Sequence, residues 1–590
     1  MFKLFRFLKP KIWLIVIVFL MIGAQSYSQL MLPRLMGEIV ANITRIEGAD
    51  NTFILNKGLE MLAYAGATII IAFATSISVS YVGAYFGKKV RSEVFKKVLT
   101  FSPGDYDRIG TASLMTRTTN DVEMVQTVIV MGLRIMVMSP VIMAIAIVQV
   151  LRTDLQLAII LAFSLPLIIL TIIILFAIAM PLFKKLQVAI DDVTKVLRAS
   201  LTGVRVVRAF NQEEKEKTRF SKVNRNLTNL ITKVGRTMSF ASPLISIFFD
   251  LTYFAIFLFG FAIINGTAND ARLDNILVTS QYAMHIMMSF LMFSMLLINI
   301  PRAGVSARRI NQVLDTKIII KDPDSPLEIT SKDYGHVRFE DVTFAFPDSQ
   351  VPTLQNITFE AKPGQVTAII GSTGSGKSSI INLIPRFYDV SKGRVLVDGV
   401  DVRDYIQKDL RDKIGFVPQQ ALLFSGTIRD NMNFGKPNST DEEIRSALEV
   451  AQAARFVSKK ENGFEAEVSQ GGKNFSGGQK QRLAIARALI KKPEIYIFDD
   501  SFSALDFKTD IRLRTALKQY TKQASVIIVA QRVSSIMDAD NILVLNEGKI
   551  VGQGKHQELL KKCQVYQEIV FSQMDESEIK RTLEIKKQVL

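Results

Sequence analysis

The sequence predicts two parts: a bundle of membrane-spanning helices, and after it a domain of alternating strands and helices. Hydrophobic residues make up 48% of the 590 residues, and the long apolar runs all lie before Arg302. From about Tyr334 onward, short β-rich runs alternate with helical stretches, which is typical of a sheet covered by helices. A chain of this length exceeds a single hydrophobic core, so we expect separate domains.

Six apolar runs are long enough to cross a bilayer, which takes roughly 20 helical residues each. A single run of this kind also fits a buried core helix, but six of them favour a membrane bundle. Because lipid offers no hydrogen-bonding partners, each span must pair its own backbone amides within one helix. The predicted spans are Ile12–Leu35, Leu59–Phe86, Thr127–Leu151, Leu155–Met180, Phe240–Ile264 and Ile276–Ile300.

The net charge of +17 follows the membrane topology and does not indicate a nucleic-acid surface. Basic residues cluster after the second, fourth and sixth runs, at Lys88–Lys97, Lys184–Lys185 and Arg302–Arg309, whereas the alternate loops carry few. Positively charged loops stay in the cytoplasm. We therefore predict a multi-pass protein of the cell (inner or plasma) membrane, in contact with membrane lipids, with both termini and the α/β domain cytoplasmic and no nucleic acid partner.

The ends of the chain and its linker complete the predicted organisation. Residues 1–11, basic and aromatic, are expected to form an interfacial elbow helix on the membrane surface and not a cleaved leader. Residues 12–318 form the predicted transmembrane domain, 319–333 a polar linker, 334–572 the α/β domain, and 573–590 a charged helical tail. A lone cysteine, Cys563, excludes an internal disulfide and a cysteine metal cluster.

Two long polar stretches between spans predict helices that continue into the cytoplasm and turn there. The turns are expected at Gly110–Arg117 and Gly203–Phe210, where mixed apolar and arginine residues suit docking onto another protein surface. The alternative is that the two turns are exposed to solvent and dock onto no other surface. In the α/β domain the pattern predicts a helix over Ser378–Leu383 and strands at Val366–Ile370, Arg394–Val397, Lys491–Phe498 and Ser525–Val529.

A glycine-rich loop follows the strand Val366–Ile370 and matches the phosphate-loop pattern in full. Its glycines let backbone N–H groups converge on phosphate oxygens at a helix N-terminus. Lys377 would reach the outer phosphates of ATP, and Ser378 would offer its hydroxyl to Mg²⁺. The predicted ATP-binding residues here are Gly371, Ser372, Thr373, Gly374, Ser375, Gly376, Lys377, Ser378 and Ser379.

An apolar strand ending in a carboxylate, Ile495–Asp499, lies downstream of the loop. Such a strand delivers its acid to the sheet edge where phosphate loops sit. We therefore expect Asp499 to hold the magnesium ion or one of its waters.

A second motif, Phe475–Gln479, is followed by the amphipathic run Lys480–Leu489. With it the chain resembles an ATP-binding-cassette (ABC) exporter half over nearly its whole length. The resemblance implies the type I ABC exporter fold: a membrane α-helical bundle of six transmembrane helices fused to an α/β P-loop nucleotide-binding domain. It also implies an ATPase-coupled transporter that takes ATP with Mg²⁺.

Further residues of this chain match motif positions of the family, in the same order along the sequence. Phe346 resembles the aromatic residue that stacks on adenine, although the family usually has tyrosine there. Gln419 resembles the glutamine that senses magnesium and relays to the membrane domain. Ser503–Asp506 resembles the loop that crosses between the two nucleotide sites, and Gln470 stands where exporters often carry a glutamate.

The resemblance also implies that two cassettes pair head to tail around ATP. Each ATP would lie between the phosphate loop of one chain and the second motif of the other chain, which corresponds to Phe475–Gln479 here and is called the signature below. In this chain the signature residues that act in trans are Ser476, Gly477, Gly478 and Gln479. Ser476 and Gly477 open a predicted helix, whose N-terminus attracts the γ-phosphate.

Two positions depart from the family pattern. Asp500 stands where a glutamate orients the attacking water, and Gln531 stands where a histidine contacts the γ-phosphate. The shorter acid misplaces its carboxylate, and an amide cannot be protonated. The alternative is that both substitutions are neutral changes in an enzyme that still hydrolyses ATP, with Asp500 acting adequately. Together the two changes resemble the weak-site half of bacterial heterodimeric multidrug exporters, which implies a homologous but distinct ABC half as partner.

The membrane part suggests an amphipathic or hydrophobic cargo. Met284, Met287, Met288, Met292 and Met295 lie in the last span, and flexible methionines suit a cavity that takes many shapes. Simple helix packing explains most of them as well. Asp250 interrupts an apolar run and could meet a cationic cargo, pair with Arg134 or accept hydroxyl hydrogen bonds. A lipid or lipopeptide flippase and a regulatory ATP-binding subunit remain alternatives.

Overall fold

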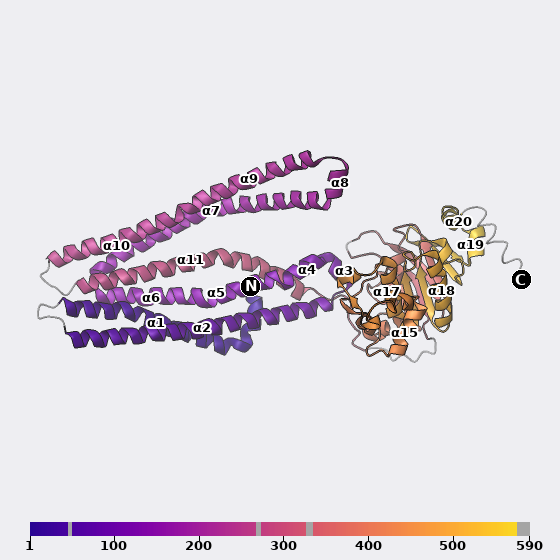
Figure 1. Cartoon of the computed structure of the whole chain (residues 1–590), viewed down its shortest axis with the longest axis horizontal. Coiled ribbons are helices and arrows are strands. Elements are labelled where there is room, and N and C mark those ends of the chain that lie inside the picture. Colours follow the sequence, from indigo (N-terminus) through magenta and orange to yellow (C-terminus); the bar gives the residue numbers. More distant parts are fainter. Residues whose placement is uncertain (45–49, 267–272, 326–333, 348, 575–590) are drawn as a thin grey trace. The chain divides into compact units, whose positions relative to one another are not determined.

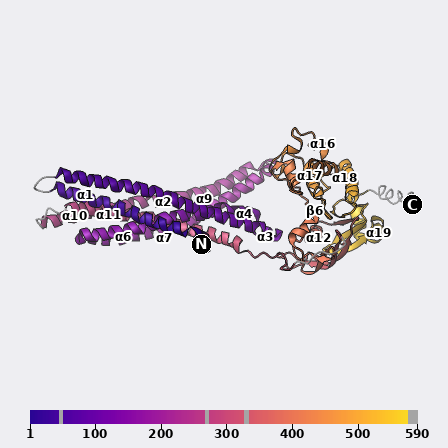
Figure 2. The same cartoon turned by 90° about the horizontal axis from the view of Figure 1, so that it is seen from below.

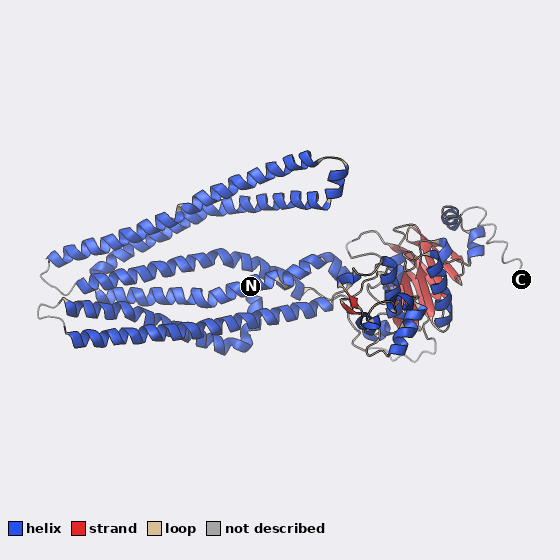
Figure 3. Cartoon of the chain, in the orientation of Figure 1, coloured by secondary structure: helices blue, strands red, loops and turns tan. Residues whose placement is uncertain are grey.

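The computed structural model describes residues 1–44, 50–266, 273–325, 334–347 and 349–574. It divides into two compact units. The membrane unit comprises Met1–Leu99 and Ala112–Thr316, and the nucleotide unit comprises Thr100–Thr111 and the chain from Lys317 onward. Strands occur in the nucleotide unit, whereas the membrane unit is built of helices (Figure 3). Parts of the predicted linker (326–333) and tail (575–590) lie outside the described residues.

Six helical stretches of the described residues are long and apolar enough to cross a membrane, as predicted. In the membrane unit α1 packs along α2, and α7 packs along α9 with the short helix α8 at the tip of that pair (Figures 1 and 2). The helices of this unit are η1 (Phe2–Lys11), α1 (Ile12–Ile43), α2 (Asn51–Leu99), α4 (Thr111–Thr118), α5 (Asn120–Met131), η2 (Gly132–Met136), α6 (Val137–Thr153), α7 (Leu155–Thr202), α8 (Val204–Ala209), α9 (Glu213–Ser239), α10 (Ala241–Gly266) and α11 (Leu273–Asp315).

The elbow helix η1 is a 3-10 helix that packs one side onto the bundle. Leu4 and Leu8 are buried, whereas Phe2 is 86% exposed. Lys3 forms an ion pair with Asp315 at 2.8 Å (Nζ to Oδ2). Asp315 is the last residue of α11, so the N-terminal helix contacts the end of the sixth membrane helix.

The turn between the second and third predicted spans lies earlier in the chain than predicted. A short helix, α3 (Pro103–Ile109), forms the tip, and Gly110 ends it with a φ of +82°. Thr111–Thr118, which covers most of the predicted turn Gly110–Arg117, is the helix α4. The physical cause is a capping box: Ser102 and Asp105 satisfy each other's backbone N–H groups, and Pro103 presets the first turn. The second tip, α8, lies within the predicted Gly203–Phe210.

The nucleotide unit is built around a six-stranded sheet with strand order β12-β11-β3-β10-β9-β6, in which only β12 is antiparallel to its neighbour. A four-stranded antiparallel sheet, β2-β1-β4-β5, accompanies it, with a small pair β7-β8. The strands are β1 (Val337–Phe344), β2 (Leu354–Ala361), β3 (Val366–Gly371), β4 (Lys392–Val397), β5 (Val400–Asp401), β6 (Ile414–Val417), β7 (Gly426–Thr427), β8 (Glu467–Val468), β9 (Ile495–Asp499), β10 (Ser525–Val529), β11 (Asn541–Asn546) and β12 (Lys549–Gly554).

Helices cover both faces of the six-stranded sheet. Alternate residues of its strands enter two different hydrophobic clusters: Ile528 lies in one, whereas Ile527 and Val529 lie in the other. This explains why the predicted strands read as continuous apolar runs. The helices of this unit beside α3 are α12 (Lys377–Leu383), α13 (Gln407–Asp412), α14 (Ile428–Asn433), α15 (Asp441–Val450), α16 (Ala454–Val457), α17 (Gly477–Leu489), α18 (Phe507–Tyr520), α19 (His556–Lys562) and α20 (Gln564–Phe571).

Most predicted strands agree with the structure within two residues, and one does not. The strand predicted at Lys491–Phe498 begins only at Ile495. Pro493 lacks an N–H for a ladder, and Lys492 has a left-handed φ of +50°, so the chain turns before the strand starts.

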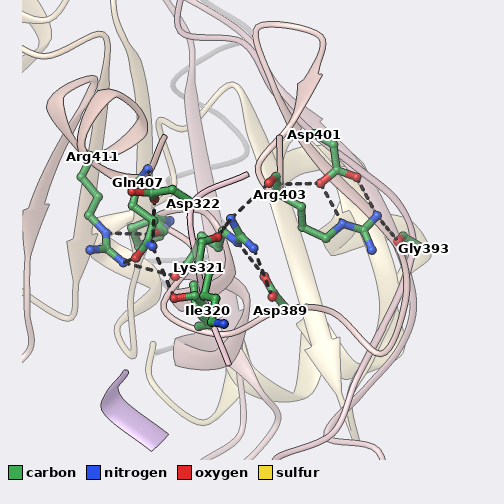
Figure 4. A network of polar contacts seen from close by, with 11 residues as sticks. Ile320, Lys321, Asp322, Asp389, Gly393, Asp401, Arg403, Gln407 and Arg411 are labelled. Atoms are coloured by element: carbon green, nitrogen blue, oxygen red, sulfur yellow. Dashed lines mark hydrogen bonds and ion pairs between the residues drawn. The ribbon is translucent and has the colours of Figure 1, made fainter. Parts of the chain in front are cut away.

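The linker after α11 is fixed to the nucleotide unit by a polar network (Figure 4). Arg386, whose side chain is 7% exposed, donates to the carbonyl of Lys321 at 3.1 Å and pairs with Asp389. Gln407 donates to Asp322 from both its backbone and its side chain, at 3.0 Å each. Residues 320–322 are therefore held by side chains that follow α12 and open α13.

We expect Arg386→Met to expose the linker to trypsin, which cuts after Lys321. Hydrogen bonds to a charged group contribute about 1.5–3 kcal/mol each, so local opening should increase roughly tenfold or more. Limited proteolysis of the full chain measures the rate. The matched control is Arg403→Met, because Arg403 lies in the same network but its side chain bonds Asp401 and Gly393 and not the linker. Equal cleavage of the two variants would contradict the assignment.

Candidate functional site

The loop between β3 and α12 carries the predicted phosphate-binding residues. Lys377, the first residue of α12, donates from Nζ to the carbonyl oxygens of Gly371 at 2.9 Å and Ser372 at 2.7 Å. Its ammonium group thus lies over the loop, where α12 presents its N-terminus. Burial lowers the pKa of Lys377, and the charges of Asp500 and Asp499 oppose this shift. A bound anion would oppose it further.

The shape of this loop requires glycine and leaves one buried hydroxyl unsatisfied. A Cβ on Gly371 would lie 2.2 Å from the carbonyl oxygen of Leu545, and Gly376 has a φ of +98°. Ser375, 2% exposed, has no hydrogen-bond partner for its Oγ among the described residues. A buried, unpaired hydroxyl in a glycine-rich loop that opens a helix fits a phosphate ligand. Thr373 is exposed at the tip of the loop and Ser379 is buried on α12.

The carboxylate of Asp499 lies beside the loop, as predicted. β9 is separated from β3 by β10 only, so the parallel strands bring Asp499 to the edge where the loop begins. Ser378 donates from Oγ to Asp499 Oδ1 at 3.4 Å. Burial raises the pKa of Asp499, the nearby Asp500 charge adds to this, and the Ser378 bond opposes it. The hydroxyl of Ser378 and the partly buried carboxylate of Asp499 are oxygen ligands of the kind that Mg²⁺ prefers.

Two hydrogen bonds hold the backbone of Asp500 in place. Its N–H donates to the carbonyl of Val529 on β10 at 2.9 Å, and its own carbonyl accepts from Ser503 Oγ at 2.9 Å. Its φ is +47°, a left-handed conformation in which the chain leaves β9 sharply. Gln419, which follows β6, donates from Nε2 to Asp500 Oδ2 at 3.4 Å. The predicted pair Gln419 and Asp500 is therefore brought together.

Gln531 follows β10, so it too emerges at this edge. Its side chain is exposed, and its carbonyl accepts from Gln573 Nε2 at 2.8 Å. Gln573 also accepts from the N–H of Val533 at 2.8 Å. The loop is thus clamped by a residue just beyond α20 that the sequence pattern did not single out.

Phe346 is 38% exposed and lies against two other aromatic rings, Phe344 and Tyr388. A partly exposed, braced ring suits stacking on a base. Tyr388 was not a predicted site residue. Its sequence signal is weak, because its role depends on a tertiary contact.

The signature residues are ordered among themselves. Ser476 caps α17, and Ser476 and Gln479 exchange hydrogen bonds between side chain and backbone at 3.0 and 3.3 Å. A Cβ on Gly478 would lie 3.1 Å from the carbonyl of Ala504, so the Ser503–Asp506 loop packs against this helix start. No hydrogen bond among the described residues joins the signature to the phosphate loop of the same chain.

The candidate cargo residues are mostly accessible. Asp250 on α10 is exposed, and within the described ranges no ion pair joins it to Arg134. In α11, Met287 is buried as helix packing requires, whereas Met284, Met288 and Met292 are 53%, 42% and 50% exposed. The side chain of Met295 lies outside the described residues.

Comparison with known proteins agrees with this geometry. Residues 13–290 match the family described as the ABC transporter transmembrane region, and residues 354–503 match the ABC transporter family. An uncharacterized ABC transporter ATP-binding protein of Mycobacterium tuberculosis is 38% identical, over 96% of this chain and 97% of its own. The ATP-dependent lipid A-core flippase of Syntrophus aciditrophicus is 29% identical, over 90% of this chain and 89% of its own.

A solved structure extends the comparison to the fold. A bacterial Atm1-family ABC exporter with ATP bound matches with a TM-score of 0.78 and 24% identity, over 97% of this chain and 99% of that chain. The likeness covers both units, the six membrane helices and the domain that carries the phosphate loop. The chain therefore belongs to the ABC transporters and is an ATPase-coupled exporter half, with the type I exporter fold.

Proposed function

We propose that this chain is one subunit of a heterodimeric exporter of amphipathic or hydrophobic compounds, of the multidrug type. Its own phosphate loop and Asp499 bind ATP with Mg²⁺ but hydrolyse it poorly. Its signature completes the active site of a distinct partner half, where hydrolysis mainly runs. The charge pattern of the loops supports a cell-membrane location with both termini and the nucleotide unit in the cytoplasm.

The fixed backbone of Asp500 carries this proposal. An aspartate ends one methylene short of a glutamate, so its carboxylate retreats by about 1.5 Å, and a misplacement near 1 Å can lower a rate by on the order of 100-fold. A mobile backbone could move forward to compensate. Here the bonds to Val529 and Ser503 hold it in place, and Gln419 further engages the carboxylate.

Gln531 is a second reason to expect slow hydrolysis, because it replaces the histidine that would contact the γ-phosphate. Its amide carries no charge and cannot exchange a proton with the reaction. Among the described histidines, His336 and His556 are partly or fully buried in other parts of the nucleotide unit, and His285 lies in α11. None of them follows a strand at the carboxyl edge, so none replaces the missing group.

The signature supports the other half of the proposal. Ser476 is in capping geometry, and added atoms at Gly477 would meet nothing within 4 Å in this chain. The start of α17 is therefore open to a ligand brought by another chain, and a helix N-terminus favours a phosphate.

The cargo assignment rests on α10 and α11. The exposed methionines of α11 offer adaptable apolar contacts, and Asp250 adds a charge within an apolar helix. A lipid or lipopeptide flippase is the second candidate, because one relative carries the name of a lipid A-core flippase. A regulatory subunit that only binds ATP would need no working signature.

The purified chain alone is expected to hydrolyse ATP slowly. Asp500→Glu combined with Gln531→His should raise its turnover by on the order of 100-fold, because the acid regains its reach and the γ-phosphate regains its histidine. Release of phosphate measures the rate. Asp500→Gln with Gln531→His is the matched control, since it restores length without charge. Brisk hydrolysis by the unaltered chain that Lys377→Ala abolishes would refute the poor-site hypothesis.

The signature is expected to be essential to the complex that copurifies with the tagged chain. Gly477→Asp places a carboxylate where the γ-phosphate should bind, so it should reduce the ATPase rate by at least roughly 100-fold. Gly235→Asp, within the helix α9, is the control, because its added Cβ also meets nothing within 4 Å and its backbone is helical. Undiminished turnover in the Gly477 variant would favour the regulatory subunit.

Asp250→Asn is expected to lower the export of cationic dyes about tenfold while neutral dyes are unaffected, because only cations gain from the carboxylate. Dye efflux from cells or vesicles that contain the complex measures both. Asp154→Asn, at the start of α7, serves as control. If cationic dyes leave as fast as before, Asp250 is not a cargo contact.

A further inference from the structure

One side chain near the C-terminal end of the described chain holds the loop that follows β10. Gln573 donates from Nε2 to the carbonyl of Gln531 at 2.8 Å, and its Oε1 accepts from the N–H of Val533 at 2.8 Å. Arg532, between them, is extended, so these two backbone groups point to the same side of the chain, as they do in a strand. The amide of Gln573, called the Gln573 clamp below, therefore takes the place of a neighbouring strand and fixes the direction in which residue 531 leaves β10.

The clamp is anchored in the core of the nucleotide unit. Gln573 lies two residues after α20, in a turn where its own N–H donates to the carbonyl of Val570 at 3.0 Å. Val570 and Tyr566 of α20 are both buried in the larger hydrophobic cluster of this unit. The hydroxyl of Tyr566 also lies 2.7 Å from Nδ1 of His556, the first residue of α19. The position of Gln573 is thus set by a packed helix.

The loop has separate attachments on either side of Gln531. Before it, the N–H of Ala530 donates to the carbonyl of Ile369 on β3 at 3.1 Å. After it, Val533 is fully buried, and Arg514 of α18 donates from Nη1 to the carbonyl of Ser534 at 3.1 Å. The clamp acts between these attachments, at the carbonyl of Gln531 itself. Loss of the clamp should therefore free residue 531 while both ends of the loop stay in place.

Gln531 emerges where a terminal phosphate would lie. β10 stands between β3, which leads into the phosphate loop, and β9, which ends at Asp499. The side chain of Gln531 is exposed at this edge. Its amide cannot be protonated, but its NH₂ group is a hydrogen-bond donor, and a phosphate oxygen is an acceptor. Because ADP lacks the γ-phosphate, the direction of Gln531 matters for ATP and not for ADP.

We propose that Gln573 is a positioning residue that holds Gln531 toward the γ-phosphate, so that this site distinguishes ATP from ADP. The inference rests on the contact between residue 531 and the γ-phosphate in the proposed function. The donor that the clamp positions gives the site affinity for ATP, although the site lacks a group that can exchange a proton. By linkage, bound ATP stabilises the clamp by the same factor by which the clamp strengthens ATP binding.

The test measures the affinities of the full chain for ATP and for ADP, each with Mg²⁺. One neutral hydrogen bond changes an equilibrium by roughly two- to tenfold, so Gln573→Ala should weaken ATP binding about three- to tenfold. ADP binding should stay unchanged, whereas damage to the fold would weaken both. Gln531→Ala should have the same effect, and the double variant should bind ATP no more weakly than the weaker single variant. Gln567→Ala is the matched control, because Gln567 of α20 donates to Leu560 and not to this loop.

A second measurement reads the clamp directly, as hydrogen exchange at the amide of Val533. Gln573→Ala should speed this exchange roughly threefold or more, and Gln567→Ala should not. In the natural chain, saturating ATP should slow the exchange more than ADP does. Unchanged exchange in Gln573→Ala would show that the clamp does not hold the loop. If Gln531→Ala weakens ATP binding and Gln573→Ala does not, the positioning role is wrong and the contact of residue 531 stands. If Gln531→Ala has no effect either, the proposed contact with the γ-phosphate fails, and the inference with it.

Discussion

The nucleotide site depends on the parallel alignment of β3, β10, β9 and β6. Because parallel strands end at one edge, the loops that follow them converge there, although they are far apart in the sequence. The phosphate loop follows β3, Gln531 follows β10, the acid pair follows β9, and Gln419 follows β6. The two hydrophobic clusters on either face hold these strands in register. The same alignment fixes the backbone of Asp500, through its bond to Val529.

Under the proposed function, the fixed backbone of Asp500 makes aspartate in place of glutamate consequential for hydrolysis. In a flexible loop, aspartate and glutamate exchange with little consequence, because the main chain adjusts by the length of a methylene. At Asp500 the neighbouring strand and Ser503 determine where the side chain starts, so its length determines where the charge ends. The phosphate loop and Ser378 keep the features that binding needs. Under the proposed function, ATP binding and ATP hydrolysis therefore separate within one site.

Much of the fold could be predicted from the sequence, because it rests on local signals. The apolar runs gave the membrane helices, and β10 has the bounds that were predicted for it. The first tip helix was missed, although Ser102, Pro103 and Asp105 are a readable helix start. By contrast, the contact of Tyr388 with Gly104 joins residues nearly 300 positions apart in the chain. Only the folded structure reveals such a contact.

The slow hydrolysis that we propose for this site has a thermodynamic consequence. A ligand that binds only one conformation stabilises it, by about 2.7 kcal/mol when its concentration is 100 times its dissociation constant. In a fast site this stabilisation is lost with every turnover. In the slow site that we propose, this stabilisation persists for as long as ATP stays bound. Under the proposed function the two sites of the dimer then have different tasks: the site of this chain stabilises the ATP-bound conformation, and the partner's site supplies the turnover.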